Sequence, residues 1–186
     1  QKVETEIEIV TETATTALVD GHHGMGAVIA HRSMRLAMDK AREYGLGAVA
    51  VRNSTHCGIA GYYALMAARE GMMGLALTNA RPVIPPTFGA EPMLGTNPIA
   101  FAAPSDAGFP FCFDAATSVV SRGKIEVHDR AEKPTPEGWV IDPEGQTLTD
   151  PRQILRGLPT GEAMMLPLGG AGEATGGYKG YSLSTM

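Results

Sequence analysis

The sequence has only two cysteines, and its basic residues are few and scattered. Cys57 and Cys112 stand in a chain of 186 residues, which is long enough to bury a core without a disulfide staple. We therefore predict two free thiols and a cytoplasmic protein. The 15 Lys and Arg residues are outnumbered by 20 Asp and Glu residues, so there is no basic field that could hold a polyanion. This balance argues against nucleic acid as a partner.

Long apolar runs and metal-ligand spacings are also missing. No stretch approaches the roughly 20 apolar residues that a membrane span needs, and no charged-then-apolar leader opens the chain, so we expect no membrane partner. The histidines and cysteines do not follow ligand spacings such as CxxC or HExxH. His22 and His23 are adjacent, and adjacent side chains rarely face one ion. We predict no metal.

What the sequence does contain is an alternation of strand and helix patterns. Apolar residues from Ala30 to Ala41 fall on one face of a helix, and Gly45 stands where a C-terminal cap is expected. The same reasoning predicts helices over 27–44, 59–70 and 119–130 and after Gly177, with strands over 4–10, 16–19, 47–51, 73–78, 99–103 and 109–113. The fold class is therefore α/β, a mixed sheet with flanking helices.

Two finer predictions concern connectivity. The strand at 47–51, the helix at 59–70 and the strand at 73–78 follow one another as a β-α-β unit. The polar stretch 129–150, rich in proline and glycine, is typical of a surface excursion. We expect residues 1–186 to form a single domain, and, because the chain starts at Gln1 and stops inside a helical pattern, to be part of a longer protein.

One histidine, His56, follows a predicted strand directly and precedes a predicted helix. In open α/β sheets ligands collect beyond the carboxyl ends of strands, where helix N-termini offer free N–H groups. An imidazole there can take or return a proton near neutral pH, and Asn53, Ser54 and Thr55 offer hydrogen bonds. The alternative is that His56 helps to cap the helix that begins at Ile59.

Asp114 and the Thr96–Asn97 pair are further candidates. Asp114 ends an apolar strand beside small residues, so its carboxylate could accept from a ribose hydroxyl, orient a histidine or cap a following helix. Thr96 and Asn97 form a tight polar loop after Gly95, which is either a binding loop or an ordinary turn.

The Gly-rich segment 169–180 matches neither the P-loop nor the Rossmann fingerprint. Lys179 is followed by Gly180 rather than Ser or Thr, and the glycine spacing is wrong for both motifs. A flexible turn that enters a helix at Gly177 beside Lys179 would still suit an anion. The alternative is a helix-entry loop with a solvated lysine.

Five ordered blocks of the sequence resemble the malate/L-lactate dehydrogenase family of NAD(P)-dependent oxidoreductases. They read VRNSTHCGIAGYYALMAAREGMMGLALTNA, GAEPMLGTNPIAFAAP, FDAATSVVSRGKIE, PEGWVIDPEGQTLTDP and LPLGG followed by GGYKGYSLSTM. The group also contains ureidoglycolate and sulfolactate dehydrogenases and reductases of diketogulonate and cyclic imines. The resemblance implies a cofactor domain unlike the Rossmann fold, and homodimers. An early Ser-His-Gly motif of the family is absent from this sequence.

The resemblance also implies roles for particular residues. The histidine of the N-S-x-H-x-G motif is His56, the implied proton donor and acceptor. Thr96 and Asn97 are expected at the substrate. The positions expected at NAD or NADP are Asn79, Asp114, Ala115, Ala116, Thr117, Tyr178 and Lys179.

The implied reaction is hydride transfer between NAD(P) and a small 2-hydroxy or 2-oxo acid such as malate or lactate. Arg52, Arg81 and Arg122 are candidates for holding the substrate carboxylate, but the resemblance makes the family's N-terminal region, which this sequence lacks, the favoured source of that cation. Two alternatives stay open: reduction of a cyclic imine or diketo acid on the same fold, and a cofactor-binding or dimerisation module without catalysis of its own.

Overall fold

A computed structural model describes residues 4–186 and divides the chain into two compact units. Unit 1 comprises Gln1–Ala76 and Ala100–Asp114, and unit 2 comprises Leu77–Ile99 and Ala115–Met186. Each unit is described by itself below, and the single domain expected over 1–186 stays a prediction. None of the helices in the described part of the chain is long and apolar enough to cross a membrane.

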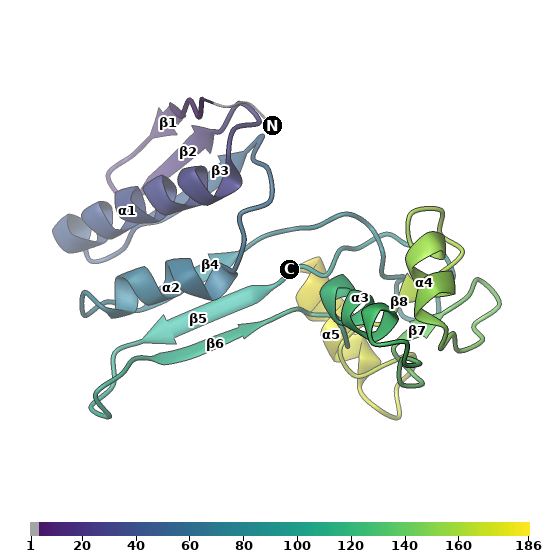
Figure 1. Cartoon of the computed structure of the whole chain (residues 1–186). Coiled ribbons are helices and arrows are strands. Elements are labelled where there is room, and N and C mark those ends of the chain that lie inside the picture. Colours follow the sequence, from purple (N-terminus) through teal and green to yellow (C-terminus); the bar gives the residue numbers. More distant parts are fainter. Residues whose placement is uncertain (1–3) are drawn as a thin grey trace. The chain divides into compact units, whose positions relative to one another are not determined.

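Helices and strands alternate along the chain (Figure 1). In order they are β1 (Glu8–Glu12), β2 (Thr16–Asp20), α1 (Gly26–Tyr44), β3 (Ala48–Arg52), α2 (Ala60–Ala68), β4 (Gly74–Leu77), β5 (Ile99–Ala103), β6 (Phe111–Ala115), α3 (Arg122–Arg130), β7 (Val140–Ile141), α4 (Pro151–Gly157), β8 (Met164–Met165) and α5 (Gly177–Thr185). The structure is thus a mixed α/β fold, as the sequence predicts.

Unit 1 is built as sheet, helix, helix, sheet. The first sheet has the order β1-β2-β3, in which β1 is antiparallel to β2 and β2 is parallel to β3. Helix α1 packs against β2 and β3 and, on its other side, against α2 (Figure 1). Methionines from both helices meet Tyr63 in that contact. The second sheet has the order β4-β5-β6.

Small residues bring α2 close to the second sheet. Ala60, Ala64 and Ala68 lie on one side of α2, and they pack against Ala100 and Ala102 of β5. Since side chains alternate across a strand, the opposite face of this sheet presents larger apolar residues. Those on β4 and β6 are exposed: Leu75, Leu77, Phe111 and Phe113.

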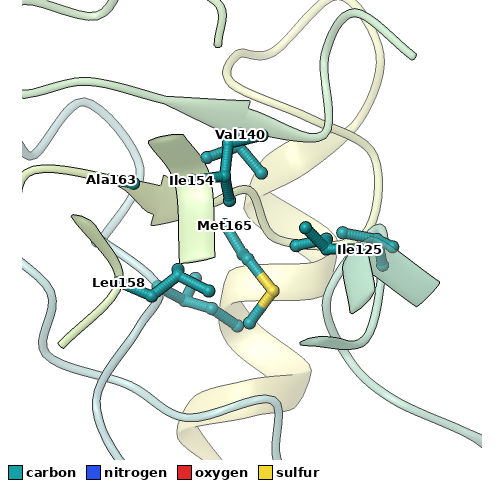
Figure 2. Close-up of a cluster of buried hydrophobic side chains, with 8 residues drawn as sticks. Ile125, Val140, Ile154, Leu158, Ala163 and Met165 are labelled. Carbon is teal, nitrogen blue, oxygen red and sulfur yellow. The ribbon is translucent and has the colours of Figure 1, made fainter. Parts of the chain in front are cut away.

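Unit 2 has its core where short elements converge. Ile125 of α3, Ile154 of α4, Val140 of β7 and Met165 of β8 are fully or almost fully buried together (Figure 2). Strands β7 and β8 pair antiparallel, with Val140 opposite Met165. Residues 166–168 follow directly from this core. Their backbone forms hydrogen bonds with residues 117–119 and with Trp139.

The predicted β-α-β unit over 47–78 is wrong. β3 and β4 lie in different sheets, so α2 does not connect two strands of one sheet. The unit of this kind is formed earlier by β2, α1 and β3, whose two strands are parallel in register from Thr16–Ala48 to Asp20–Arg52. Strand pairing is a non-local choice, and the sequential order of elements does not determine it.

Three predicted boundaries also shift, each for a reason that the structure shows. The strand predicted at 4–10 is β1 at Glu8–Glu12, because Thr5 instead accepts from the amide of Met25 at 3.0 Å. The strand predicted at 109–113 begins at Phe111, because Pro110 has no N–H for the ladder. The helix predicted over 119–130 begins only at Arg122, because the Val119 amide bonds to Leu166 O at 2.9 Å.

The stretch 129–150 is more than a surface excursion. Val140 is fully buried, and Trp139 and Leu148 pack against the core of unit 2. The short helix α4 that follows is absent from the sequence-based prediction. Its signal was present, because Asp150 accepts from the Arg152 amide at 2.9 Å as an N-cap and Pro151 occupies the first turn.

Candidate active site

The His56 loop, residues 53–59, lies in unit 1 between β3 and α2. It leaves the carboxyl end of β3 beside the carboxyl end of the parallel strand β2. The predicted position of His56 after a strand and before a helix is observed, and the parallel partner of that strand is β2. Such an edge gathers backbone N–H groups and loop side chains, which is where α/β folds place their ligands.

A second loop, residues 21–25 before α1, is bonded to the end of β3 and to the first part of the His56 loop. The Gly21 amide donates to Arg52 O at 3.0 Å and the His23 amide to Asn53 O at 2.7 Å. Thr55 completes the connection, because its hydroxyl donates to Gly24 O at 2.8 Å and accepts from the Gly26 amide at 3.0 Å. The two loops therefore form one ordered surface.

Asp20 lies at the base of this surface and is almost fully buried. Its carboxylate accepts from the His22 amide at 2.9 Å, from Arg52 Nε at 2.8 Å and from Asn53 Nδ2 at 2.9 Å. The hydrogen bond from the His22 amide is the main reason that the pKa of Asp20 falls from 3.8 to about 2, against the opposing effect of burial. The group is a carboxylate at all physiological pH values.

The side chain of His56 is exposed, whereas that of the next residue, Cys57, packs against the α1–α2 core. His56 Nδ1 accepts from the Gly58 amide at 3.1 Å. A neutral ring held in this way carries its proton on Nε2, so Nε2–H is the group presented outward. On its inner side the loop is anchored by the hydroxyl of buried Tyr63, which donates to Cys57 O.

His56 does not cap α2. No side chain at the N-cap position, Ile59, bonds to the helix, and His56 bonds to Gly58 ahead of it. The cap comes from a distant strand, because Asp114 Oδ2 of β6 accepts from the Gly61 amide at 2.6 Å. Of the roles considered for Asp114, a helix cap is observed, but on α2 rather than on a following helix. Within the described residues its second oxygen accepts no hydrogen bond.

Four of the other predicted residues lie together in unit 2, around the side chain of Asn97. Asn97 Oδ1 accepts from the Ala80 amide at 2.9 Å, and Nδ2 donates to Ser184 O of α5 at 2.8 Å. The buried Thr117 hydroxyl donates to the carbonyls of Thr96 and Asn97, each at 3.1 Å. Asn79 precedes Ala80 and is exposed. Asn97 and Thr117 are thus used internally, as a brace for the loop.

The remaining cofactor candidates lie in two places, at the end of β6 and in the first turn of α5. Ala115 and Ala116 are partly buried. Tyr178 and Lys179 are exposed in the first turn of α5, with Lys179 Nζ 5.7 Å from the centre of the Tyr178 ring. A Cβ on Gly177 would lie 1.9 Å from Gly170 O, so the Gly-rich loop closes tightly on this turn. Among the described residues, Lys179 forms no ion pair.

Three residues of the His56 surface were missed by sequence reasoning: Asp20, Gly26 and Tyr63. Gly26 permits close contact, since a Cβ there would lie 2.1 Å from Thr55 O and 2.6 Å from His56 O. A signal existed only for Asp20, which is an acidic residue at the end of a predicted strand. Nothing local in the sequence marks Gly26 or Tyr63.

Comparison with known proteins finds relatives that match almost the whole chain. The chain is 52% identical over 180 residues to a malate dehydrogenase of Pyrococcus abyssi, covering 97% of this chain and 48% of that protein. It is 40% identical over 185 residues to a malate/(S)-sulfolactate dehydrogenase of Methanothermus fervidus, covering 100% of this chain and 50% of that protein.

Similarity extends to solved structures. The crystal structure of malate dehydrogenase from Entamoeba histolytica matches with a TM-score of 0.95 and 47% identity, over 97% of this chain and 50% of that one. The chain therefore spans about half the length of the relatives it matches. A sequence model of the family described as malate/L-lactate dehydrogenase matches residues 1–186, and the chain belongs to that family.

Proposed function

We propose that the protein is an oxidoreductase that transfers a hydride between NAD or NADP and a small 2-hydroxy or 2-oxo acid, such as malate, lactate or sulfolactate. The observation that carries this proposal is the exposed His56 imidazole on a braced loop, in a chain of the malate/L-lactate dehydrogenase family. When a hydride moves to or from C2 of such an acid, another group must donate or accept the proton on the C2 oxygen.

His56 supplies that partner group in the proposed mechanism. With Nδ1 bonded to the Gly58 amide, Nε2–H can donate a hydrogen bond to a 2-oxo oxygen. Complete proton donation starts from the imidazolium, in which Nδ1 also carries a proton and releases the Gly58 amide. In oxidation Nε2 must be free to accept the hydroxyl proton, so the ring proton again lies on Nδ1. The His56–Gly58 hydrogen bond is therefore present only in the neutral Nε2–H tautomer, and it is absent from both reacting forms of the ring.

The nicotinamide cofactor would supply the hydride acceptor or donor. We propose that Lys179 and the start of α5 meet its phosphates, because the lysine is exposed beside a tightly closed Gly-rich turn. Three further residues have polar groups that could form hydrogen bonds with the cofactor: Asn79, Tyr178 and Asp114. Ala115, Ala116 and the buried Thr117 would contribute shape rather than side-chain hydrogen bonds.

At the substrate we propose that Thr96 makes the contact and Asn97 holds the loop. The Thr96 hydroxyl has no hydrogen-bond partner within the described residues, whereas both amide atoms of Asn97 are already engaged. Arg52 is partly committed to Asp20 through Nε. A cation for the substrate carboxylate is sought first at Arg81, which is exposed beside the Ala80 amide.

The test is a comparison of His56→Asn with His23→Asn. Asparagine can keep the bond to the Gly58 amide through its Oδ1 while removing Nε2. His23 is exposed on the neighbouring loop and serves as the matched control. Oxidation of NADH and NADPH is followed with oxaloacetate, pyruvate, sulfopyruvate and a cyclic imine acid. We expect His56→Asn to lose at least about 100-fold in kcat with cofactor affinity retained, and His23→Asn to lose little.

Retention of near-normal kcat in His56→Asn would reject the assigned role. Turnover of the imine alone would favour the reductase alternative, which shares the family but not the substrate class. The two coenzymes separate NAD from NADP use, which the sequence leaves open.

The second candidate function is a cofactor-binding or dimerisation module without independent catalysis. It is favoured by one observation, that the chain spans about half the length of its relatives. Trp139 is the only tryptophan, so energy transfer from its emission to NADH measures binding directly. Sedimentation velocity in the same samples tests the proposed homodimer. Binding without turnover of any substrate would select this function.

A further inference from the structure

We infer that Asp20 is the positioning residue of His56: its carboxylate holds the start of the His56 loop in the one conformation that presents the imidazole. The inference rests on the proposed role of His56 and extends it to a residue outside the family motif. It is carried by the geometry around Asp20, which links two loops at the end of the parallel strands.

Asp20 is 5% exposed, and its three hydrogen-bond donors come from the last residue of β3, Arg52, and from residues just beyond β2 and β3, His22 and Asn53. One oxygen accepts from the His22 amide. The other accepts from both Arg52 and Asn53. In the parallel ladder Asp20 stands opposite Arg52, so the carboxylate is centred between the two loops that leave the sheet. A carboxylate can accept all these bonds together, which a neutral side chain cannot.

Two residues bonded to Asp20 have left-handed backbone. His22 has φ of 47° and Asn53 has φ of 53°, in a region that Asn and His enter more often than other non-glycine residues but that is still uncommon for them. Such residues persist where surrounding bonds fix them. Since both residues bond to Asp20, the carboxylate supplies that fixation for both loops at once.

Other charged groups face Asp20 from the neighbouring elements. His22 Nδ1 lies 3.6 Å from Asp20 Oδ1, and His22 Nε2 lies 3.1 Å from Glu8 Oε2 of β1. Arg52 is the cation on β3. Because Glu8 and His22 are more exposed than Asp20, solvent screens them, and the buried carboxylate is the fixed centre of the group.

From Asn53 the constraint reaches His56 through Ser54 and Thr55. The Asn53 carbonyl accepts from the His23 amide, and Thr55 bonds to Gly24 and Gly26. Without the Asp20 bonds, Asn53 can leave its left-handed conformation, and the direction of the following residues changes. The Gly58 amide would then no longer meet His56 Nδ1.

The experiment measures the His56 ring directly by ¹⁵N NMR, in the wild type and in Asp20→Asn. We expect the wild type to show the Nε2–H tautomer. In Asp20→Asn we expect the two ring nitrogens to shift towards the average of a ring that exchanges tautomers. The signal is assigned with His56→Asn. Asp106→Asn is the matched control, because Asp106 is exposed in the β5–β6 turn.

The inference is overturned if Asp20→Asn folds and its His56 ring keeps the wild-type tautomer and the wild-type ¹⁵N chemical shifts. If Asp20→Asn does not fold, Asn53→Asp replaces it: aspartate tolerates the left-handed backbone about as well as asparagine, but it has no N–H to donate to Asp20. The same NMR change is expected, and its absence is equally decisive.

Kinetics separate this inference from the proposed function. If His56 is catalytic, Asp20→Asn lowers kcat by about tenfold to a hundredfold with little change in the coenzyme KM, because the general acid-base group is misplaced. If His56→Asn retains full kcat, the proposed catalytic role of His56 fails, but the NMR comparison still decides whether Asp20 positions the ring.

Discussion

The hydroxyl of Tyr63 donates a hydrogen bond to the carbonyl oxygen of Cys57, and this bond ties α2 to the loop that carries His56. Removing it in Tyr63→Phe should cost about 1 kcal/mol of unfolding free energy, the usual net value of one hydrogen bond. Urea unfolding followed by circular dichroism measures the change. Tyr62→Phe is the control, because the Tyr62 hydroxyl is exposed and 3.4 Å from His31 Nδ1.

The same tyrosine predicts a dependence on alkaline pH. Burial raises the pKa of Tyr63 above its usual value of 10. Its contribution to stability is therefore complete below pH 10 and is lost as the pH rises through the folded-state pKa. Wild type should lose its advantage over Tyr63→Phe above pH 10. An advantage that stays constant there would contradict the assignment.

Asp20 predicts the opposite dependence, at acid pH. Its pKa is lowered from 3.8 to about 2, so the carboxylate stabilises the folded state above about pH 4. That contribution decreases as the pH falls from about 4 to about 2. Asp20→Asn should accordingly be less stable than wild type at neutral pH and approach it near pH 2. Circular dichroism is the suitable probe, since Trp139 lies in unit 2.

Gly26 predicts a purely steric effect on the candidate site. In Gly26→Ala the new methyl group meets the carbonyls of Thr55 and His56, and we expect a loss of about 1 to 3 kcal/mol. Gly123→Ala in α3 is the control, because a Cβ there meets nothing within 4 Å and alanine favours the helix. Denaturant unfolding of both variants checks the contrast. Equal stabilities would contradict the close contact at Gly26.

Asn97 predicts a structural effect in unit 2. Asn97→Gly keeps the positive φ of 31° but removes the bonds to Ala80 and Ser184, so we expect a loss of about 2 kcal/mol. Trp139 fluorescence during urea unfolding measures it. Asn79→Gly, at an exposed neighbouring position, should change stability by less than about 1 kcal/mol. A neutral Asn97→Gly would show that the brace is dispensable and would leave the side chain free for a ligand.

Local patterns predicted the elements well where one stretch of sequence contained the whole signal. α1 begins at Gly26 against a predicted 27, and it ends at Tyr44 as expected, with Gly45 in the left-handed conformation at φ 81°. The apolar periodicity and the terminal glycine are both local. Sheet membership is not local, since β4 joins β5 rather than β3, and this is why the β-α-β prediction failed.

The same contrast between local and non-local signals applies to the candidate site. The position of His56 after a strand end followed from the sequence, because strand and helix patterns flank it. The braces that hold it did not, because each joins residues far apart in the chain: Asp20 with Asn53, Gly26 with Thr55, and Asp114 with Gly61. The cofactor and substrate residues named from the family resemblance stay predictions.

The bond between Asp114 and Gly61 also bears on the order of folding. It joins residues that are 53 positions apart, so it forms only after the β5–β6 hairpin has folded back onto α2. Closing so long a loop costs entropy that a lone hydrogen bond does not recover, and the hairpin must supply the rest. During synthesis, α2 and the His56 loop leave the ribosome well before Asp114. The start of α2 is therefore completed late, and slowing hairpin formation should delay the maturation of this loop more than that of α1.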